Sequence, residues 1–320
     1  MTTETLILGI DGGGTKTVAW LATWQPGATG GDTAVIGRGR AGASNPQSIG
    51  FDRAAERLER SVAAAFVDAG RTVQPVTAAT IGLAGSDREE IRQQLRAWAE
   101  RTELATRVRF VHDALPVLAA ASQDGWGVAL IAGTGSLAYG QATNGQTARS
   151  GGWGFLFGDE GSGFALGAAA LRAVMQAADG RGPATTLSRA ILNHCQISQP
   201  EGLITAIYRS KDPRLTLAGL AEVVTAQAQV GDAIARRIVE HAAGDLAGMV
   251  RAVAVRLDLA DRPFPLACAG GVLVHSGRVA DRLLNHLAKL GLQASPTVTV
   301  TDPVEGALRL AARDVAELPR

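Results

Sequence analysis

The sequence predicts an α/β fold built from two related halves. A strand, a turn rich in Gly and Thr, and a second strand follow one another at residues 6–21 and again at residues 128–140. Residues 266–269 form a third apolar strand that ends at Gly270-Gly271. Helical patterns fill the intervals between these strands, and such alternation is typical of sheets covered by helices. The repeated strand–turn–strand unit indicates an internal duplication.

Each element follows from local patterning. Apolar runs interrupted by glycines predict strands at 6–10, 17–21, 108–111, 128–132 and 266–269. Apolar residues at helical spacing predict helices at 51–68, 115–122, 164–178 and 233–257. Ser86 and Glu89 form a capping-box pattern that would open a helix ending near Thr102. We expect an N-terminal lobe over 1–118 and a C-terminal lobe over 119–320, with a last helix at about 304–318 packing back on the N-terminal lobe.

Composition excludes several classes of partner. The chain has 320 residues, with 31 basic and 30 acidic side chains and a formal net charge of +1. This balance argues against nucleic acid and anionic membranes as partners. Cys195 and Cys268 lie far apart in the sequence, without the spacing of a metal-binding or disulfide framework. No long apolar run free of charge suggests a membrane span or a signal peptide. We therefore expect a cytoplasmic protein.

The glycine turns are candidate phosphate sites. Glycines let backbone amides approach phosphate oxygens closely, and the turn at 11–17 adds a carboxylate and hydroxyls. The run from Gly9 nearly matches a Walker A loop, but Thr15 stands where that loop has Lys, and a strand follows instead of a helix. An ordinary tight turn is the alternative for each glycine cluster taken alone.

Taken in order, these motifs resemble a known family. Asp11-Gly-Gly-Gly-Thr15, Gly133-Thr-Gly-Ser136 and Gly270-Gly271 resemble the sugar kinase–actin–chaperone superfamily. The segment G-G-W-G-F-L-F-G-D-E-G-S at 151–162 resembles its N-acetylglucosamine kinase branch, also labelled BadF/BadG-type ATPases. The resemblance spans nearly the whole chain. It implies two ribonuclease-H-like lobes of the actin-like ATPase fold, with ATP in the cleft between them.

The resemblance also implies roles for individual residues. The catalytic base would be Asp113, and Asp11 would hold Mg²⁺ through water, since Mg²⁺ usually keeps several waters. The ATP-binding residues would be Asp11, Gly12, Gly13, Gly14, Thr15, Lys16, Thr134, Gly135, Gly270, Gly271 and Ser276. The sugar-binding residues would be Asn45, Asp113, Gly135, Ser136, Gly152, Trp153, Gly154 and Asp159.

The residues alone leave alternatives open. Asp113 and Asp159 each precede a predicted helix and could be helix caps. Asn45 could belong to an ordinary Asn-Pro turn, Trp153 could be a core residue, and Lys16 could be a solvated turn residue.

The resemblance implies ATP-dependent phosphorylation of an amino sugar, N-acetylglucosamine or glucosamine, at its 6-hydroxyl. ATP and Mg²⁺ would be required, and a homodimer is expected. Leu137 stands where many N-acetylglucosamine kinases have a sugar-contacting Asn, which leaves the choice of sugar open. The alternatives are an ATPase that activates a partner enzyme and an ATP-dependent sugar sensor. Related activators hold an iron–sulfur cluster through cysteines, for which Cys195 and Cys268 provide few ligands.

Overall fold

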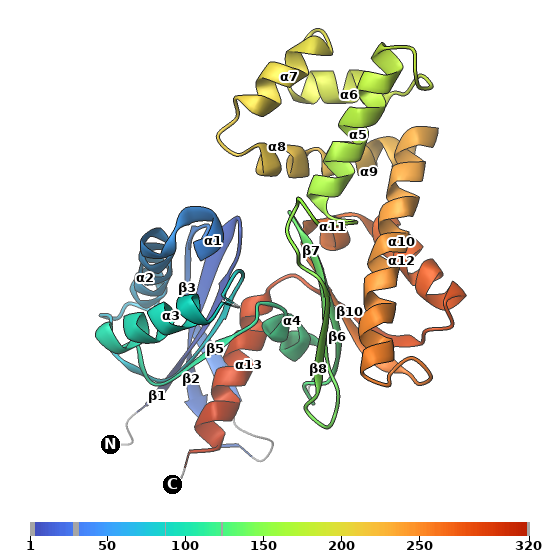
Figure 1. Ribbon diagram of the computed structural model, residues 1–320. Helices are drawn as coiled ribbons and strands as arrows, with labels where there is room; N and C mark the ends of the chain where they lie inside the picture. The colour runs from blue at the N-terminus through green and yellow to red at the C-terminus, as the bar shows by residue number, and fades with distance from the viewer. Residues whose placement is uncertain (1–3, 28–31, 87, 123, 319–320) are drawn as a thin grey trace. The chain divides into compact units, whose positions relative to one another are not determined.

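The computed structural model describes residues 4–27, 32–86, 88–122 and 124–318. These residues form two compact units (Figure 1). Unit 1 comprises Met1–Gly125 and Asp302–Arg320, and unit 2 comprises Trp126–Thr301. The boundary expected at residue 118 lies within helix α4 (Ala114–Ala121), and unit 1 extends a little beyond that helix.

The described part of unit 1 contains one five-stranded sheet with the order β3-β2-β1-β4-β5. Its strands are β1 (Thr5–Gly12), β2 (Lys16–Gln25), β3 (Asp32–Gly42), β4 (Val76–Leu83) and β5 (Ala105–Val111). Strands β1 to β3 are antiparallel neighbours, whereas β4 and β5 run parallel to β1. The carboxyl ends of β1, β4 and β5 therefore meet at one edge of the sheet.

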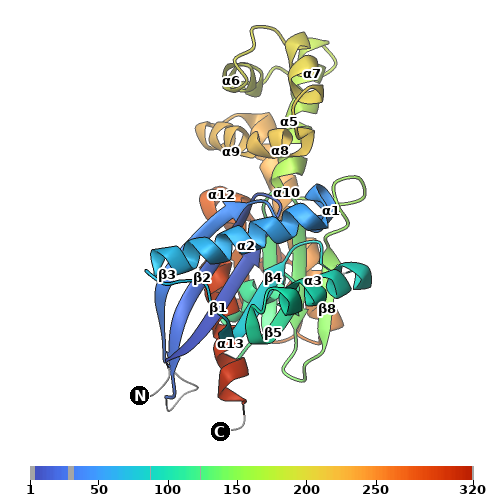
Figure 2. The ribbon, with the colours of Figure 1, turned by 90° about the vertical axis from the view of Figure 1, so that its left-hand side faces the viewer.

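Helices cover both faces of this sheet, as Figure 2 shows for α2, α3 and α13. The helices of unit 1 are α1 (Pro46–Ile49), α2 (Phe51–Asp68), α3 (Glu89–Arg101), α4 and α13 (Pro303–Ala316). Alternate residues of β1 point to opposite faces. Leu8 and its same-face neighbours pack with residues of α2 and α3, whereas Ile7 packs with residues of α13. The C-terminal helix is thus an integral part of unit 1.

The capping box predicted for α3 is wrong. The N-cap residue of α3 is Arg88, and its side chain makes no capping hydrogen bond. The hydroxyl of Ser86 instead donates to the carbonyl of Leu83 at 2.7 Å, which closes the turn after β4. Asp87, within the same pattern, lies outside the described residues.

The described part of unit 2 repeats the arrangement with a second five-stranded sheet, of order β10-β9-β6-β7-β8. Its strands are β6 (Gly127–Ala132), β7 (Ser136–Gln141), β8 (Thr147–Gly151), β9 (Phe264–Ala269) and β10 (Ala294–Val300). As in unit 1, three strands form an antiparallel meander and two further strands add in parallel.

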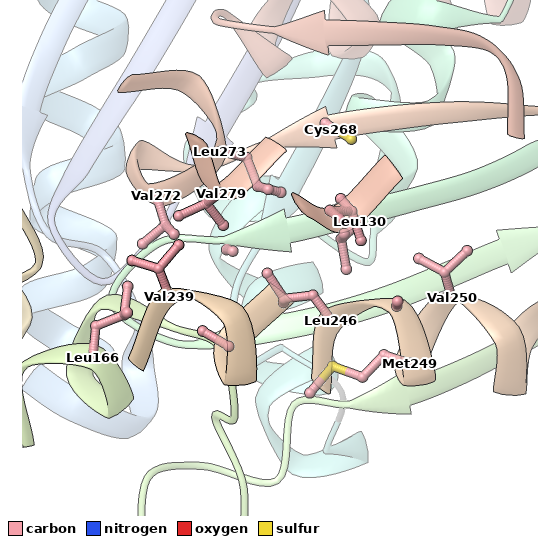
Figure 3. Packing of buried hydrophobic residues seen from close by; sticks show 14 of the residues in the cluster. Leu130, Leu166, Val239, Leu246, Met249, Val250, Cys268, Val272, Leu273 and Val279 are labelled. Carbon is pink, nitrogen blue, oxygen red and sulfur yellow. The ribbon is translucent and has the colours of Figure 1, made fainter. Parts of the chain in front are cut away.

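The helices of unit 2 pack on this sheet and extend from it. They are α5 (Gly163–Ala178), α6 (Leu187–His194), α7 (Glu201–Tyr208), α8 (Pro213–Gly219), α9 (Ala221–Val230), α10 (Ala233–Arg256), α11 (Gly271–His275) and α12 (Gly277–Lys289). Figure 3 shows Leu130 of β6 and Cys268 of β9 in one core with Leu246 of α10 and Val279 of α12. None of the helices in the described ranges combines the length and apolar character that a membrane crossing needs.

The predicted α/β class and its two related lobes are confirmed. Both units carry the same meander-plus-parallel sheet, which is the two-lobed arrangement expected from the duplicated turns. The helices between 187 and 230 were not predicted, because their short apolar patterns carry no motif that distinguishes them from loops.

Candidate functional site

The glycine turn of unit 1 is held by neighbouring backbone. The turn joins β1 to β2, and the amide of Gly13 donates to the carbonyl of Lys16 at 3.0 Å. The carbonyls of Gly12 and Gly13 accept hydrogen bonds from the amides of Ala84 and Ser44. A Cβ at Gly12 would overlap the buried Ser44 hydroxyl, so glycine is required for this close approach.

Three carboxylates of unit 1 gather near this turn. Asp11 lies beside Gly82 of β4, which in turn lies beside Val111 of β5, so Asp113 follows the neighbouring strand end. Burial, together with the nearby carboxylates of Asp113 and Asp302, raises the pKa of Asp11 from 3.8 to about 7. The Lys16 ammonium acts in the opposite direction. A cation bound near Asp11 would offset both its loss of hydration and the charge of the neighbouring carboxylates.

Asp113 occupies the N-cap position of α4 without acting as a cap. Its side chain accepts no hydrogen bond from the first turn of the helix. Its Oδ1 instead lies 2.9 Å from Nδ1 of His112, and these two form an ion pair only when His112 is protonated. The same Nδ1 accepts the backbone N–H of Ala114 at 3.2 Å. The carboxylate of Asp113 therefore remains half-exposed at the strand ends, where a substrate hydroxyl could reach it.

Asn45 does act as a helix cap. Its Oδ1 accepts a hydrogen bond from the amide of Gln47 at 2.9 Å at the start of α1. This oxygen therefore has the local role of an ordinary Asn-Pro turn. An amide side chain also carries two N–H donors, which leaves it able to contact a further ligand. Ser44 hydrogen-bonds to the glycine turn, and this places Asn45 beside the turn in unit 1.

The remaining phosphate candidates of unit 1 face solvent. Thr15 and Lys16 are exposed. A Cβ at Gly14 would meet no other heavy atom within 4 Å, so this part of the turn leaves space for a ligand. Thr17 is different, because its hydroxyl is buried and donates to the carbonyl of Gly42.

The second glycine turn lies in unit 2 between β6 and β7. The amide of Gly133 donates to the carbonyl of Gly135 at 2.9 Å, and the carbonyl of Gly133 accepts the amide of Gly163 at 2.8 Å. Gly270, with φ of +91°, packs directly on this turn, and a Cβ there would lie 2.8 Å from the Gly133 nitrogen. The structure thereby brings together the turn of Thr134, the start of α5 and the Gly270-Gly271 motif.

Asp159 points at the same turn and does not cap α5, whose cap is the hydroxyl of Ser162. Asp159 is only 2% exposed and has a φ of +64°. Its Oδ1 accepts the amide of Ser136 at 3.2 Å, and its Oδ2 accepts a hydrogen bond from Nη2 of Arg214 at 3.1 Å. Sequence reasoning missed Arg214, because it lies on α8 within a segment that carries no recognisable motif.

The loop after β8 is tied to this turn at one end and exposed at the other. The amide of Gly152 donates to the carbonyl of Ser136 at 2.9 Å. Trp153 is 65% exposed, so the alternative that it is a core residue is excluded. The guanidinium of Arg149 stacks on its ring, 4.9 Å from the ring centroid. Gly154 follows with φ of +83°.

Ser276 lies apart from the glycine turn. It caps α12, where its Oγ accepts the amide of Val279 at 3.4 Å, and α11 separates it from Gly270. Beside this cap, α10 and α12 line an open pocket of about 670 Å³. Its polar lining includes Arg236, Arg237, Glu240, Arg278, Arg282 and His286. Arg278, Arg282 and His286 belong to α12, the second helix after Gly270.

Comparisons with known proteins agree with this arrangement. The chain is 33% identical over 267 residues to an N-acetylmuramic acid/N-acetylglucosamine kinase of Clostridium acetobutylicum, covering 83% of this chain and 85% of that protein. It is 33% identical over 319 residues to an N-acetyl-D-glucosamine kinase of Dictyostelium discoideum, covering 96% and 97%.

Solved structures show the same fold. A Chromobacterium violaceum protein, described provisionally as an N-acetylglucosamine kinase, matches with a TM-score of 0.77 and 27% identity over 96% of this chain and 99% of its own. A ROK family glucokinase of Streptomyces griseus matches with a TM-score of 0.56 and 18% identity over 97% and 98%. The model of the BadF/BadG/BcrA/BcrD ATPase family matches residues 8–311, and the chain belongs to this family.

Proposed function

We propose that this protein transfers the γ-phosphoryl group of ATP to the 6-hydroxyl of an amino sugar. The observation that carries the proposal is the position of Asp113. Its carboxylate lies at the strand ends near Asp11, and it makes no helix-capping hydrogen bond although it occupies a cap position. A carboxylate in this position can accept the proton of a bound hydroxyl.

In the proposed reaction, Asp113 takes the proton from the sugar 6-hydroxyl. A bond forms between that oxygen and the γ-phosphorus as the bond from this phosphorus to the bridging oxygen of ADP breaks. ADP leaves, and Asp113 later returns its proton to solvent. The protein contributes mainly by positioning the two reactants and by stabilising charge, because phosphoryl transfer needs little covalent chemistry from the enzyme.

The two glycine turns are the proposed phosphate sites. The backbone amide of Gly14 in unit 1, and those of Thr134 and Gly135 in unit 2, would donate to phosphate oxygens. The hydroxyls of Thr15 and Thr134 and the Lys16 ammonium could add further donors. Asp11 would hold Mg²⁺ through water, since it lies near the carboxylates of Asp113 and Asp302, whose charge a cation offsets. The bound cation would neutralise charge on the phosphates.

We place the base of the nucleotide at the pocket between α10 and α12. Helix α12 is the second helix after Gly270-Gly271, and the pocket volume of about 670 Å³ is within the usual range for ligand pockets. The guanidinium groups of Arg236 and Arg278 could stack on a purine face or donate to its ring nitrogens. Ser276 caps α12 and would therefore support one wall of this pocket. In this proposal Ser276 acts through the helix, whereas the sequence predicted a direct contact between Ser276 and ATP.

The sugar would be bound by Asn45 and Asp113 from unit 1 and by Gly135, Ser136, Gly152–Gly154 and Asp159 from unit 2. Both kinase relatives at 33% identity are named for N-acetylated amino sugars, which supports this substrate class. Leu137 is 8% exposed, and a Cβ added to Gly152 would lie 3.1 Å from its Cδ1. An apolar group here predicts weaker selection for the N-acetyl group.

The family name also includes ATPases that could act without a sugar. An ATPase that activates a partner through a cysteine-bound cluster has little support, because Cys268 is buried and burial raises the pKa of its thiol to about 12. Metal ligation needs the thiolate, which this environment disfavours. Free thiols also fit the reducing cytoplasm that we propose as the location of the protein.

A coupled ADP-release assay tests the proposal. The acceptors are N-acetylglucosamine, glucosamine, N-acetylmuramic acid, glucose, a polyol and no acceptor. We expect ADP formation that depends on an amino sugar and disappears with 6-deoxy-N-acetylglucosamine, which lacks the accepting hydroxyl. Mass spectrometry should find one added phosphate on the sugar. ADP formation at the same rate without acceptor would support the ATPase instead.

A further inference from the structure

Asp159 is a carboxylate that cannot remain buried without compensation. It is 2% exposed, and an ionised carboxylate removed from water is unfavourable unless charges or donors surround it. The Ser136 amide supplies one hydrogen bond, and the Arg214 guanidinium supplies a second hydrogen bond and a positive charge. The sequence motifs account for Asp159 and Ser136, whereas Arg214 belongs to no motif.

Arg214 is presented by a helix whose position is fixed by close packing. The α8 helix begins at Asp212, whose side chain accepts the Leu215 amide at 3.1 Å. Its other end lies against α5, because a Cβ on Gly167 would overlap the carbonyl oxygen of Leu217. Helix α5 follows directly on the loop that carries Asp159. The two ends of the ion pair are therefore attached to two helices in direct backbone contact.

The guanidinium group also lies against the glycine turn. A Cβ on Gly135 would be 2.6 Å from Asp159 Oδ1 and 2.9 Å from Arg214 Nη2. The carbon of the guanidinium is 5.8 Å from the centroid of the Phe155 ring, within the range of a cation–π contact. Its Nε is buried and has no hydrogen-bond partner among the described residues. Arg214 thus contacts Gly135 and Asp159, two residues to which the proposed function assigns sugar binding.

We propose that Arg214 is a positioning residue for the sugar: it pairs with Asp159 and aims its carboxylate at a sugar hydroxyl. This inference rests on the proposed function, in which Asp159 contacts the sugar. Each carboxylate oxygen can accept two hydrogen bonds, so Oδ1 and Oδ2 can keep their present partners and still accept from a hydroxyl. Arg214 suits this task because its planar fork fixes direction as well as charge.

The inference predicts a specific kinetic signature. Loss of Arg214 should weaken sugar binding in the ground state and the transition state alike, which raises KM for the sugar more than it lowers kcat. KM for ATP should remain unchanged. A residue needed only for folding would instead lower the active fraction and melting temperature and spare the sugar KM, or would disturb both KM values together.

The experiment compares Arg214→Gln, Arg214→Lys and a control, Arg209→Gln, with the wild type. Arg209 is an exposed arginine at the C-terminal end of α7, a few residues before α8. KM is measured for N-acetylglucosamine at saturating ATP and for ATP at saturating sugar. We expect the Gln variant to raise the sugar KM roughly 10- to 100-fold, the range for a hydrogen bond to a charged group, with the ATP KM within about twofold.

The Lys variant keeps the charge without the fork, so we expect an intermediate sugar KM and a folded protein even where the Gln variant proves unstable. The control should match the wild type. An unchanged sugar KM in either folded Arg214 variant, or equal changes in both KM values, would overturn the proposal. Sugar-independent ADP formation by the wild type itself would overturn the proposed function and, with it, this inference. The failure of the proposed function is thus seen in the wild type, whereas the failure of the inference alone is seen only in the Arg214 variants.

Discussion

Replacing Asp11 with asparagine should make the stability of the protein less sensitive to a rise in pH from about 4 to 7. The folded state holds the pKa of Asp11 at about 7, against 3.8 for an unperturbed carboxyl. Between these values the folded state binds a proton that the unfolded state has lost, so the wild type loses stability as pH rises from about 4 through 7. Asparagine cannot ionise and does not share this loss.

The size of the effect follows from the shift. From pH 5 to pH 7 the pKa difference corresponds to about 3 kcal/mol at most, because one pH unit is worth 1.36 kcal/mol. Asp11 is only half-buried, and solvent screening reduces this figure, so we take about 1.5 kcal/mol as the expected size. A change of this size shifts the melting temperature of a domain of 150–250 residues by roughly 3–6 °C.

Thermal melts at pH 5 and pH 8, without Mg²⁺ or nucleotide, measure this. The melting temperature of Asp11→Asn minus that of the wild type should rise by several degrees between the two pH values. Asp124→Asn, which alters an exposed carboxylate of unit 1, is the matched control and should show no such rise. If the difference for Asp11→Asn is the same at both pH values, folding does not raise the pKa of Asp11 as we infer.

Three further predictions concern nucleotide and sugar selection. Leu137→Asn should shift the ratio of kcat/KM for N-acetylglucosamine over glucosamine by roughly 5- to 150-fold, which corresponds to about 1–3 kcal/mol for a buried polar contact. Leu137→Ala adds no polar group and should leave this ratio unchanged. An unchanged ratio in Leu137→Asn would place residue 137 outside the sugar pocket. Gly270→Ala should lower the melting temperature and abolish nucleotide-induced stabilisation, because its φ is +91° and a Cβ would overlap Ala132; a variant that still gains stability from ADP would contradict this contact. Arg278→Ala should raise KM for ATP with little change in KM for the sugar, measured in the ADP-release assay; a selective rise in the sugar KM would contradict the placement of the base.

The parts of the fold predicted from sequence are those with local signals. The helix predicted at 51–68 matches α2, because its apolar residues recur at helical spacing along one face. Both glycine turns were predicted because a glycine cluster between two apolar runs permits few other structures. These signals need no knowledge of distant residues.

The capping box of Ser86 and Glu89 shows where a local signal is insufficient. The spacing fits a helix start, but the Ser86 hydroxyl is buried and finds a closer acceptor in Leu83. The competing hydrogen bond closes the turn after β4, and the helix begins later. Short polar side chains can serve the backbone in either way, and tertiary context decides between them.

The candidate site could be predicted only as separate pieces. Motifs identified Asp11, Asp113 and Asp159, but not the groups that surround them. Arg214 reaches Asp159 across 55 residues, and Asp302 approaches Asp11 from the start of the C-terminal helix. Such contacts depend on how helices pack on the sheets, for which a single sequence gives no pattern.

The central claim is that Asp113 is the general base of an amino-sugar kinase, and turnover of Asp113→Asn tests it most directly. The variant keeps the size of the side chain and removes only its ability to accept the proton. The measurement is kcat with N-acetylglucosamine, or with the best acceptor of the panel, alongside the affinity for ADP. We predict that turnover falls by roughly 10²- to 10⁴-fold, the usual contribution of a general base, while ADP affinity stays within about twofold of the wild type. Near wild-type turnover with sugar phosphate as product would contradict the account.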